Sequence, residues 1–182
     1  MSRIPTHTLD GAPPESRVLL DSIVAASPTG RPLNFQAQMG HAPAVLASYV
    51  GLRRAGEEFG VLDGKHRAAI MLTAAAALGN RYTQAVASML ALRSGWNESQ
   101  VRALVAGAGT GNDRLDPLLN VVREAATDGG RVKDDTWQAA LACGWTSGQL
   151  AEAFAPLALI VYTTWFINYA DTEPDLPTTP AA

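Results

Sequence analysis

Apolar residues recur at helical spacing along most of the chain, and no stretch alternates apolar and polar residues for long enough to suggest a sheet. The pattern therefore predicts an all-α fold. Proline, glycine and asparagine breaks divide it into expected helices at 14–26, 43–58, 63–78, 82–94, a short one from 97, 115–126, 134–142 and 147–170, with a turn at 33–40.

The first two long helices each have one clearly apolar face. The residues expected to point inward are Val18, Leu19, Ile23 and Val24 in the first, and Val45, Leu46, Tyr49 and Leu52 in the second. The next helix, with Asp63 as its expected N-cap, is rich in alanine from Ala68 onward. A central helix packed closely on several sides requires such small side chains.

Composition narrows the class of protein. The 182 residues, 47% of them hydrophobic, are enough for one domain with its own core. The net charge of −3 comes from scattered acidic and basic residues, so we expect neither nucleic acid nor a membrane as partner, but a small-molecule ligand.

The N-terminus lacks an apolar stretch of signal-peptide length and the apolar run 154–167 is too short to span a bilayer, so we expect a cytoplasmic protein.

The chain has a single cysteine, Cys143. An intrachain disulfide, a multi-cysteine zinc site and a Cys-x-x-Cys redox pair are therefore all excluded. A lone thiol among small apolar residues is usually inert packing, and we expect no redox role for it.

Between residues 62 and 107 the order is helix, a break at Gly79-Asn80, helix, Gly95 and a short helix. This order resembles the core of the carboxymuconolactone decarboxylase and alkylhydroperoxidase D-like superfamily. Family members carry a glutamate in the first helix and Cys-x-x-Cys-x-x-x-His, or Tyr-x-x-x-x-His, at the start of the second. On this alignment the glutamate falls on Ala68, the cysteines on Asn80 and Thr83, and the histidine on Ala87, whereas the aromatic residue is kept as Tyr82.

The resemblance covers nearly the whole chain. It implies a bundle of about seven to nine helices in a single domain, 1–182, with a core at about 43–170, a surface tail at 172–182 and assembly into a homo-oligomer. It also implies that the thiol peroxidase chemistry of the family has been lost, because every residue of that machinery is substituted.

Other residues near the vacated positions are candidates for a recruited site. His66 and Arg67 lie within a turn of the glutamate position, and Arg81 and Tyr82 begin the next helix, so a cation and a phenol there would clamp an anionic or enolic ligand. These four are the predicted catalytic residues, although exposed helix-end charges for the arginines, a solvated surface position for His66 and core packing for Tyr82 also explain them. The predicted substrate-binding residues are Asn80, Thr83, Gln84, Ala87, Ala68 and Trp165, with no metal ligand among them.

Two functions remain open on the sequence. The first is a cofactor-free, non-redox enzyme of lyase or isomerase type that acts on a small, partly apolar acid, lactone or enolisable carbonyl compound, as the decarboxylase branch of the family implies. The alternative is a catalytically inactive member that binds a ligand or serves a structural role. The alanines around Ala68, Ala75 and Ala87 leave room for a ligand and favour the first.

Overall fold

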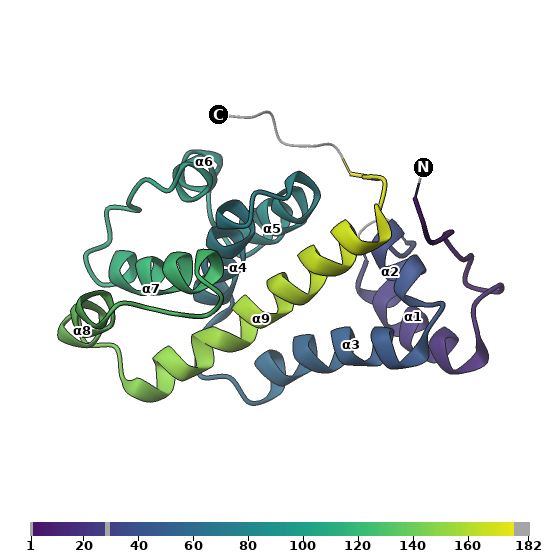
Figure 1. Ribbon diagram of the computed structural model, residues 1–182, viewed down its shortest axis with the longest axis horizontal. Helices are drawn as coiled ribbons and strands as arrows, with labels where there is room; N and C mark the ends of the chain where they lie inside the picture. The colour runs from purple at the N-terminus through teal and green to yellow at the C-terminus, as the bar shows by residue number, and fades with distance from the viewer. Residues whose placement is uncertain (1, 28–29, 177–182) are drawn as a thin grey trace.

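The computed structural model describes residues 2–27 and 30–176, and within them the chain forms nine α-helices and no strand (Figure 1). In chain order they are α1 (Pro14–Ala26), α2 (Asn34–Met39), α3 (Pro43–Glu58), α4 (Gly64–Ala77), α5 (Arg81–Arg93), α6 (Glu98–Ala106), α7 (Leu115–Thr127), α8 (Asp134–Ala142) and α9 (Ser147–Ala170). The all-α prediction is confirmed.

Local signals fix most helix ends. Pro14 and Pro43 occupy first helical positions, where a missing N–H is harmless. The Asp63 carboxylate accepts a hydrogen bond from the backbone N–H of His66 at 2.8 Å and so caps α4, as predicted. Asn97 and Thr146 cap α6 and α9 in the same way.

The segment 33–40, expected to be a turn, contains the six-residue helix α2 instead. Its start is held by the Gln36 side chain, whose Oε1 accepts from the Leu33 N–H at 2.8 Å. A helix of this length is not stable alone in water. It forms here because residues 35–39 are all buried, which periodicity over so short a segment does not reveal.

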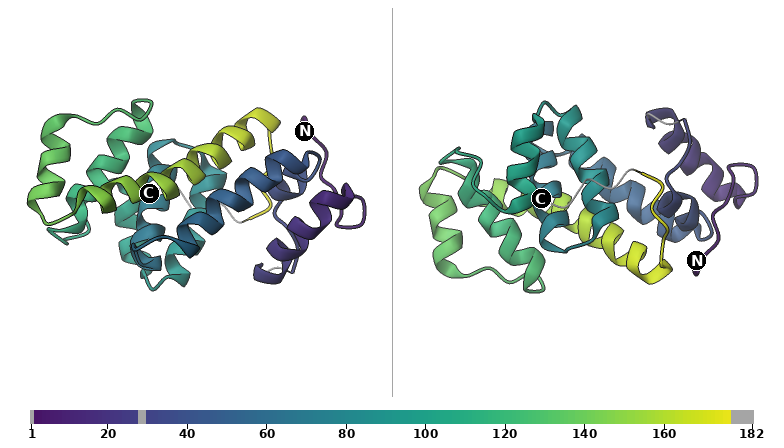
Figure 2. Two further views of the ribbon diagram at one scale, coloured as in Figure 1. Left: turned by 90° about the horizontal axis from the view of Figure 1, so that it is seen from below. Right: turned by 90° about the horizontal axis from the view of Figure 1, so that it is seen from above.

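The long helix α9 runs diagonally across the molecule with α3 beside it, while α1 and α2 lie at one end and α7 and α8 at the other (Figures 1 and 2). Helix α4 is central and contacts α5, α6, α7 and α9. Ala68, Ala69, Ala74 and Ala75 are all buried, which lets the surrounding helices approach it closely. The predicted role of this alanine-rich helix is therefore confirmed.

Helix α9 is, by length and composition alone, long and apolar enough to cross a membrane. The run 154–167, which the sequence suggested was too short to do so, is thus part of a longer helix. In the fold, however, α9 packs along α3 and α4 and buries Leu157, Ile160 and Ile167 among other residues. A core helix of a soluble protein has these properties.

Two expectations about individual side chains are wrong. Val18 is 72% exposed, and Leu20 takes the buried position on α1 beside Ile23. The reason is that α1 packs on α3, and Leu20 belongs to the same hydrophobic cluster as Leu46 and Tyr49 of that helix. Cys143 is exposed at the C-terminus of α8 and is not packed in the core.

The two ends of the described chain are tied to each other. The backbone N–H of Arg3 donates to the Ala170 carbonyl at 2.8 Å. The buried Gln38 amide donates to the Ile4 carbonyl at 2.7 Å and accepts from the Thr172 hydroxyl at 2.5 Å. Residues 172–176 therefore pack more closely than a surface tail would, and the rest of the predicted tail, 177–182, lies outside the described residues.

Candidate functional site

Asn80 and Thr83, onto which the resemblance places the family's cysteines, lie at the start of α5 and face α9. Asn80 caps α5 by accepting from the Thr83 N–H at 2.9 Å, and the Thr83 hydroxyl donates to the same Asn80 oxygen at 3.1 Å. The Thr164 hydroxyl in turn donates to Thr83 at 3.1 Å, and the Asn80 amide donates to Asn168 at 2.7 Å. Side chains of α9 thus satisfy the polar groups of Asn80 and Thr83.

Little space remains beside these hydrogen-bonded side chains. Ala68 and Ala87, onto which the resemblance places the family's glutamate and histidine, are 1% and 0% exposed, and Ala75 is equally buried. All three belong to the hydrophobic cluster built on α4 and line neither of the two cavities described below. The room for a ligand expected around them is filled by the packed core.

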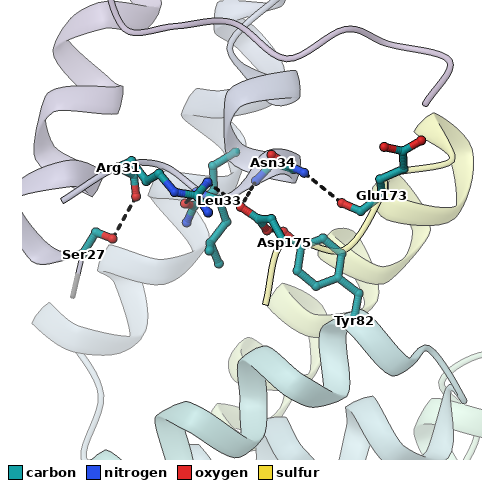
Figure 3. A network of polar contacts seen from close by, with 8 residues as sticks. Ser27, Arg31, Leu33, Asn34, Tyr82, Glu173 and Asp175 are labelled. Carbon is teal, nitrogen blue, oxygen red and sulfur yellow. Dashed lines mark hydrogen bonds and ion pairs between the residues drawn. The ribbon is translucent and has the colours of Figure 1, made fainter. Parts of the chain in front are cut away.

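Tyr82 contacts the segment that follows α9 (Figure 3). Its hydroxyl donates a hydrogen bond to Asp175, which also accepts from Arg31 Nη1 at 2.7 Å and from the Asn34 N–H at 3.2 Å. The Asn34 amide donates to the Glu173 carbonyl at 2.9 Å. We call residues 172–176 the C-terminal strap, because these contacts hold them across α2 and α5.

The Tyr82 hydroxyl stays protonated in this setting. Burial raises the pKa of Tyr82 above its ordinary value of 10.0, and the Asp175 carboxylate that accepts its hydrogen raises it further. The phenol is therefore a neutral donor with its hydrogen already used.

The remaining predicted residues lie apart from one another. Arg81 is exposed and, with Asn80 and Tyr82, lines a shallow hollow beside α9 that we call the tail hollow. The imidazole Nδ1 of His66 lies 2.9 Å from the Asp63 carboxylate. Gln84 is half-buried and lines neither the tail hollow nor the cavity described next. Trp165 is 66% exposed on α9.

A second cavity, of about 300 Å³, lies where α1, α2, α3, α4, α5 and α9 meet, and we call it the α3–α5 cavity. Its apolar wall includes Met71, Val86, Met89, Leu90 and Leu159. Its polar side chains include Gln36, Tyr49, Arg53, Glu57, Arg67 and Arg93, that is, three arginines against one carboxylate in a chain whose net charge is −3. Leu176 of the C-terminal strap also lines it.

Arg67 is the member of the predicted set that the structure places on this cavity. It is half-buried, and its guanidinium donates to the Leu62 carbonyl just before α4. The predicted face of α5, through Thr83 and Ala87, is turned by about 60° from the face through Val86 and Leu90 that lines the cavity. The cavity therefore lies beside the predicted face of α5 and not on it.

The polar end of the α3–α5 cavity is built by α2 and α3. The Gln36 amide Nε2 donates to the Tyr49 hydroxyl at 3.1 Å, and Arg53 Nε lies 3.3 Å from the Glu57 carboxylate. Tyr49 is only 8% exposed, and burial raises the pKa of its phenol, although contacts with Gln36 and Arg53 act in the opposite direction. The phenol is neutral at physiological pH and remains a hydrogen-bond donor.

Sequence reasoning treated Tyr49 as an inward-facing core residue and missed this group. The available signal was the spacing of Tyr49, Arg53 and Glu57 at four-residue intervals, which places them along one face of α3. The turn that the sequence predicts at 33–40 gives no reason to expect Gln36 beside Tyr49.

No protein-family model and no curated protein matches the chain. Solved structures do match it. A peroxidase-related protein of uncharacterised function from Ralstonia eutropha JMP134, described as an alkylhydroperoxidase AhpD core, superposes with a TM-score of 0.83 at 16% identity over 96% of this chain and 92% of that one. A peroxidase-related protein from Silicibacter sp. TM1040 gives a TM-score of 0.78 at 11% identity over 96% and 94%.

The debrominase Bmp8 is similar to the same extent. Its free form and a cysteine-to-alanine variant in complex with 2,3,4-tribromopyrrole both give a TM-score of 0.80 at 16% identity, over 95% of this chain and 91% of that one. At such identities a match establishes the fold alone. The chain therefore shares its all-helical fold with the structure described as an alkylhydroperoxidase AhpD core and with Bmp8.

Proposed function

We propose that this protein is a cofactor-independent, non-redox enzyme of lyase or isomerase type, and that it acts in the α3–α5 cavity on a small, partly apolar organic acid, lactone or enolisable carbonyl compound. The observation that carries the proposal is the combination of an apolar wall with three arginines in a cavity of about 300 Å³. A space of this size and lining suits a small molecule with an apolar body and an anionic end.

The charged groups define what the cavity does to a ligand. A guanidinium can bind a carboxylate through two parallel hydrogen bonds. The cavity has three guanidinium groups, those of Arg53, Arg67 and Arg93. Glu57 is the carboxylate on the wall, and we assign it the proton transfer that isomerisation or decarboxylation needs. Redox chemistry of the thiol type has no support, because the chain has a single cysteine and it lies outside the cavity lining.

The residues predicted from the sequence take different parts in this proposal. Arg67 remains a ligand-binding residue. We propose that Tyr82 positions the C-terminal strap, whose Leu176 closes one side of the cavity. Similarity to Bmp8, whose variant binds tribromopyrrole, supports a ligand of this size on this fold.

The test is a thermal-shift screen of the purified protein against lactones, keto acids, phenolic acids and quinones. A ligand at about 100 times its Kd stabilises the native state by roughly 2.7 kcal/mol, which is readily measured. We expect hits among acids that disappear in Arg53→Ala and persist in Arg81→Ala, whose side chain lies on the tail hollow. Turnover of the hits, followed by proton NMR in D₂O, then identifies the reaction. Hits that persist in Arg53→Ala would contradict the assignment to this cavity.

A second candidate is a catalytically inactive binding or structural protein. It is favoured by the hydrogen bonds that Asn80 and Thr83 already make to side chains of α9, which leave no space for a ligand at these two predicted positions. The same screen separates the two, because a binding protein gives thermal shifts without turnover and a structural one gives neither.

We also propose that the protein works in the cytoplasm as a homo-oligomer. Phe154, Trp165 and Tyr169 of α9 are 61%, 66% and 74% exposed. Large apolar side chains that share one exposed helix face are typical of a surface covered by another subunit.

A further inference from the structure

The hydroxyl of Tyr49 has its oxygen occupied and its hydrogen unassigned. The Gln36 carboxamide is oriented by its Oε1, which accepts from the Leu33 N–H at 2.8 Å, so its Nε2 must face Tyr49 as a donor. The phenol oxygen is consequently an acceptor in that contact. Among the described residues, no acceptor for the Tyr49 hydrogen is found.

This donor belongs to a largely buried side chain on the wall of the cavity. Tyr49 lines the α3–α5 cavity, is 8% exposed, and rests edge-on against Phe35 with ring centroids 5.6 Å apart. A buried hydroxyl hydrogen without an acceptor is unfavourable by an amount comparable to a lost hydrogen bond. The arrangement is therefore completed when a ligand supplies an acceptor oxygen.

The surroundings select the kind of oxygen. Arg53, one helical turn from Tyr49, retains 36% side-chain exposure, and Arg93 is exposed as well, so a carboxylate held there keeps part of its hydration. The Tyr49 side chain is more buried, with 8% exposure. A neutral carbonyl oxygen loses less on desolvation than a carboxylate and suits the neutral phenol donor.

We infer that Tyr49 donates a hydrogen bond to the oxo group of a 2-oxo acid whose carboxylate is held by Arg53 and whose apolar chain lies against Met71, Val86 and Leu90. This inference rests on the proposed function and names its substrate class. Gln36 acts as a positioning residue, because it fixes the phenol oxygen as an acceptor and so turns the hydrogen toward the ligand.

The experiment compares two acids that differ only in the oxo group, 4-methyl-2-oxopentanoate and 4-methylpentanoate, by isothermal titration calorimetry. The parent should bind the oxo acid about tenfold more tightly, as expected for one hydrogen bond of about 1.4 kcal/mol. Tyr49→Phe should bind both acids equally, at the affinity that the parent has for 4-methylpentanoate. Tyr162→Phe is the matched control, since its hydroxyl donates to the Val45 carbonyl at 2.9 Å and does not line the cavity.

Other outcomes separate the two proposals. If the parent binds both acids without preference, or if Tyr49→Phe keeps the tenfold preference, the inference about Tyr49 is wrong while the cavity remains an acid site. If the parent binds neither acid, the small-acid function fails together with it. A measurement on the parent protein alone covers the case in which Tyr49→Phe does not fold: the ¹³C resonance of C2 in labelled oxo acid should move downfield on binding, and an unchanged resonance in the bound state overturns the inference.

Discussion

The Tyr82 hydroxyl donates a hydrogen bond to the Asp175 carboxylate, although the two residues are 93 positions apart in the chain. Asp175 also pairs with Arg31 at 2.7 Å, so one carboxylate joins α5, the segment before α2 and the C-terminal strap (Figure 3). Its side chain is only 10% exposed. Phe35 lies edge-on to both Tyr82 and Tyr49, and thereby links this contact to the α3–α5 cavity.

Removing this carboxylate should destabilise the fold. In Asp175→Ala the Tyr82 hydroxyl and the Arg31 guanidinium both lose their shared partner, so we expect a loss of about 2 to 3 kcal/mol in the free energy of unfolding. For a chain of this length that is roughly 5 to 10 °C in Tm. Urea denaturation measures the change, with Asp113→Asn on the exposed loop after α6 as the control. Equal stability of Asp175→Ala and the parent would show that the strap contributes nothing.

Stability at high pH should depend on two tyrosines. Burial raises the pKa of Tyr49 and of Tyr82 above 10.0, so both phenols hold their protons in the folded state at a pH where the unfolded chain has lost them. Their contribution is complete below pH 10 and is lost as the pH rises through the folded-state values, with a slope of about 1.4 kcal/mol per pH unit for each phenol. Tyr49→Phe and Tyr82→Phe should each make the loss between pH 10 and 11 less steep. Identical slopes in the parent and the double variant would contradict the shifted pKa values.

The hydrogen-bonded side chains of Asn80, Thr83 and Thr164 should behave as one unit. Thr83→Val leaves the buried Thr164 hydroxyl without its acceptor, and we expect it to cost about 1 to 3 kcal/mol. The double variant Thr83→Val, Thr164→Val removes both partners with little change in shape, and should cost less than the sum of the single variants. Urea unfolding of the four proteins gives the coupling, and additive losses would mean that the contact is not formed.

A third threonine supplies the control for that cycle. Thr163 is also buried on α9, but its hydroxyl donates to the Leu159 carbonyl of its own helix at 2.7 Å. Thr163→Val should therefore show no coupling to Thr83→Val.

The sequence predicts the helices better than it predicts what surrounds them. Pro14, Pro43 and Asp63 act through groups within a turn of themselves, so the ends of α1, α3 and α4 follow from local chemistry. Helix α2 and the C-terminal strap have no such signal. Both are held by residues far away in the chain, α2 by burial and the strap by Tyr82 and Arg31.

The candidate site was misplaced for a related reason. Family motifs point to Asn80, Thr83 and Ala87, but the cavity opens on the neighbouring face of α5, through Val86 and Leu90. Which face of a buried helix adjoins empty space depends on the side chains of other helices. Of the predicted ligand clamp, Arg67 lines this cavity, and Tyr49 was missed because an inward-facing tyrosine looks like core from its spacing alone.

The exposed face of α9 leads to a prediction about assembly. Phe154, Trp165 and Tyr169 are separated by eleven and four residues, which places them on one side of a helix with about 3.6 residues per turn. If a second subunit covers this side, a charge at its centre is buried without a partner and opposes association by several kcal/mol.

We therefore expect the parent to sediment as an oligomer at micromolar concentration, and Trp165→Asp to sediment as a smaller species with unchanged helix content by circular dichroism. Leu92→Asp is the matched control. Leu92 is also an exposed apolar residue, at 44%, but it belongs to α5 and not to α9. A change in both variants would indicate general loss of structure or a different interface. Sedimentation of the parent as a monomer would instead mean that the aromatic side chains of α9 face solvent, and that the α3–α5 cavity is complete within one chain.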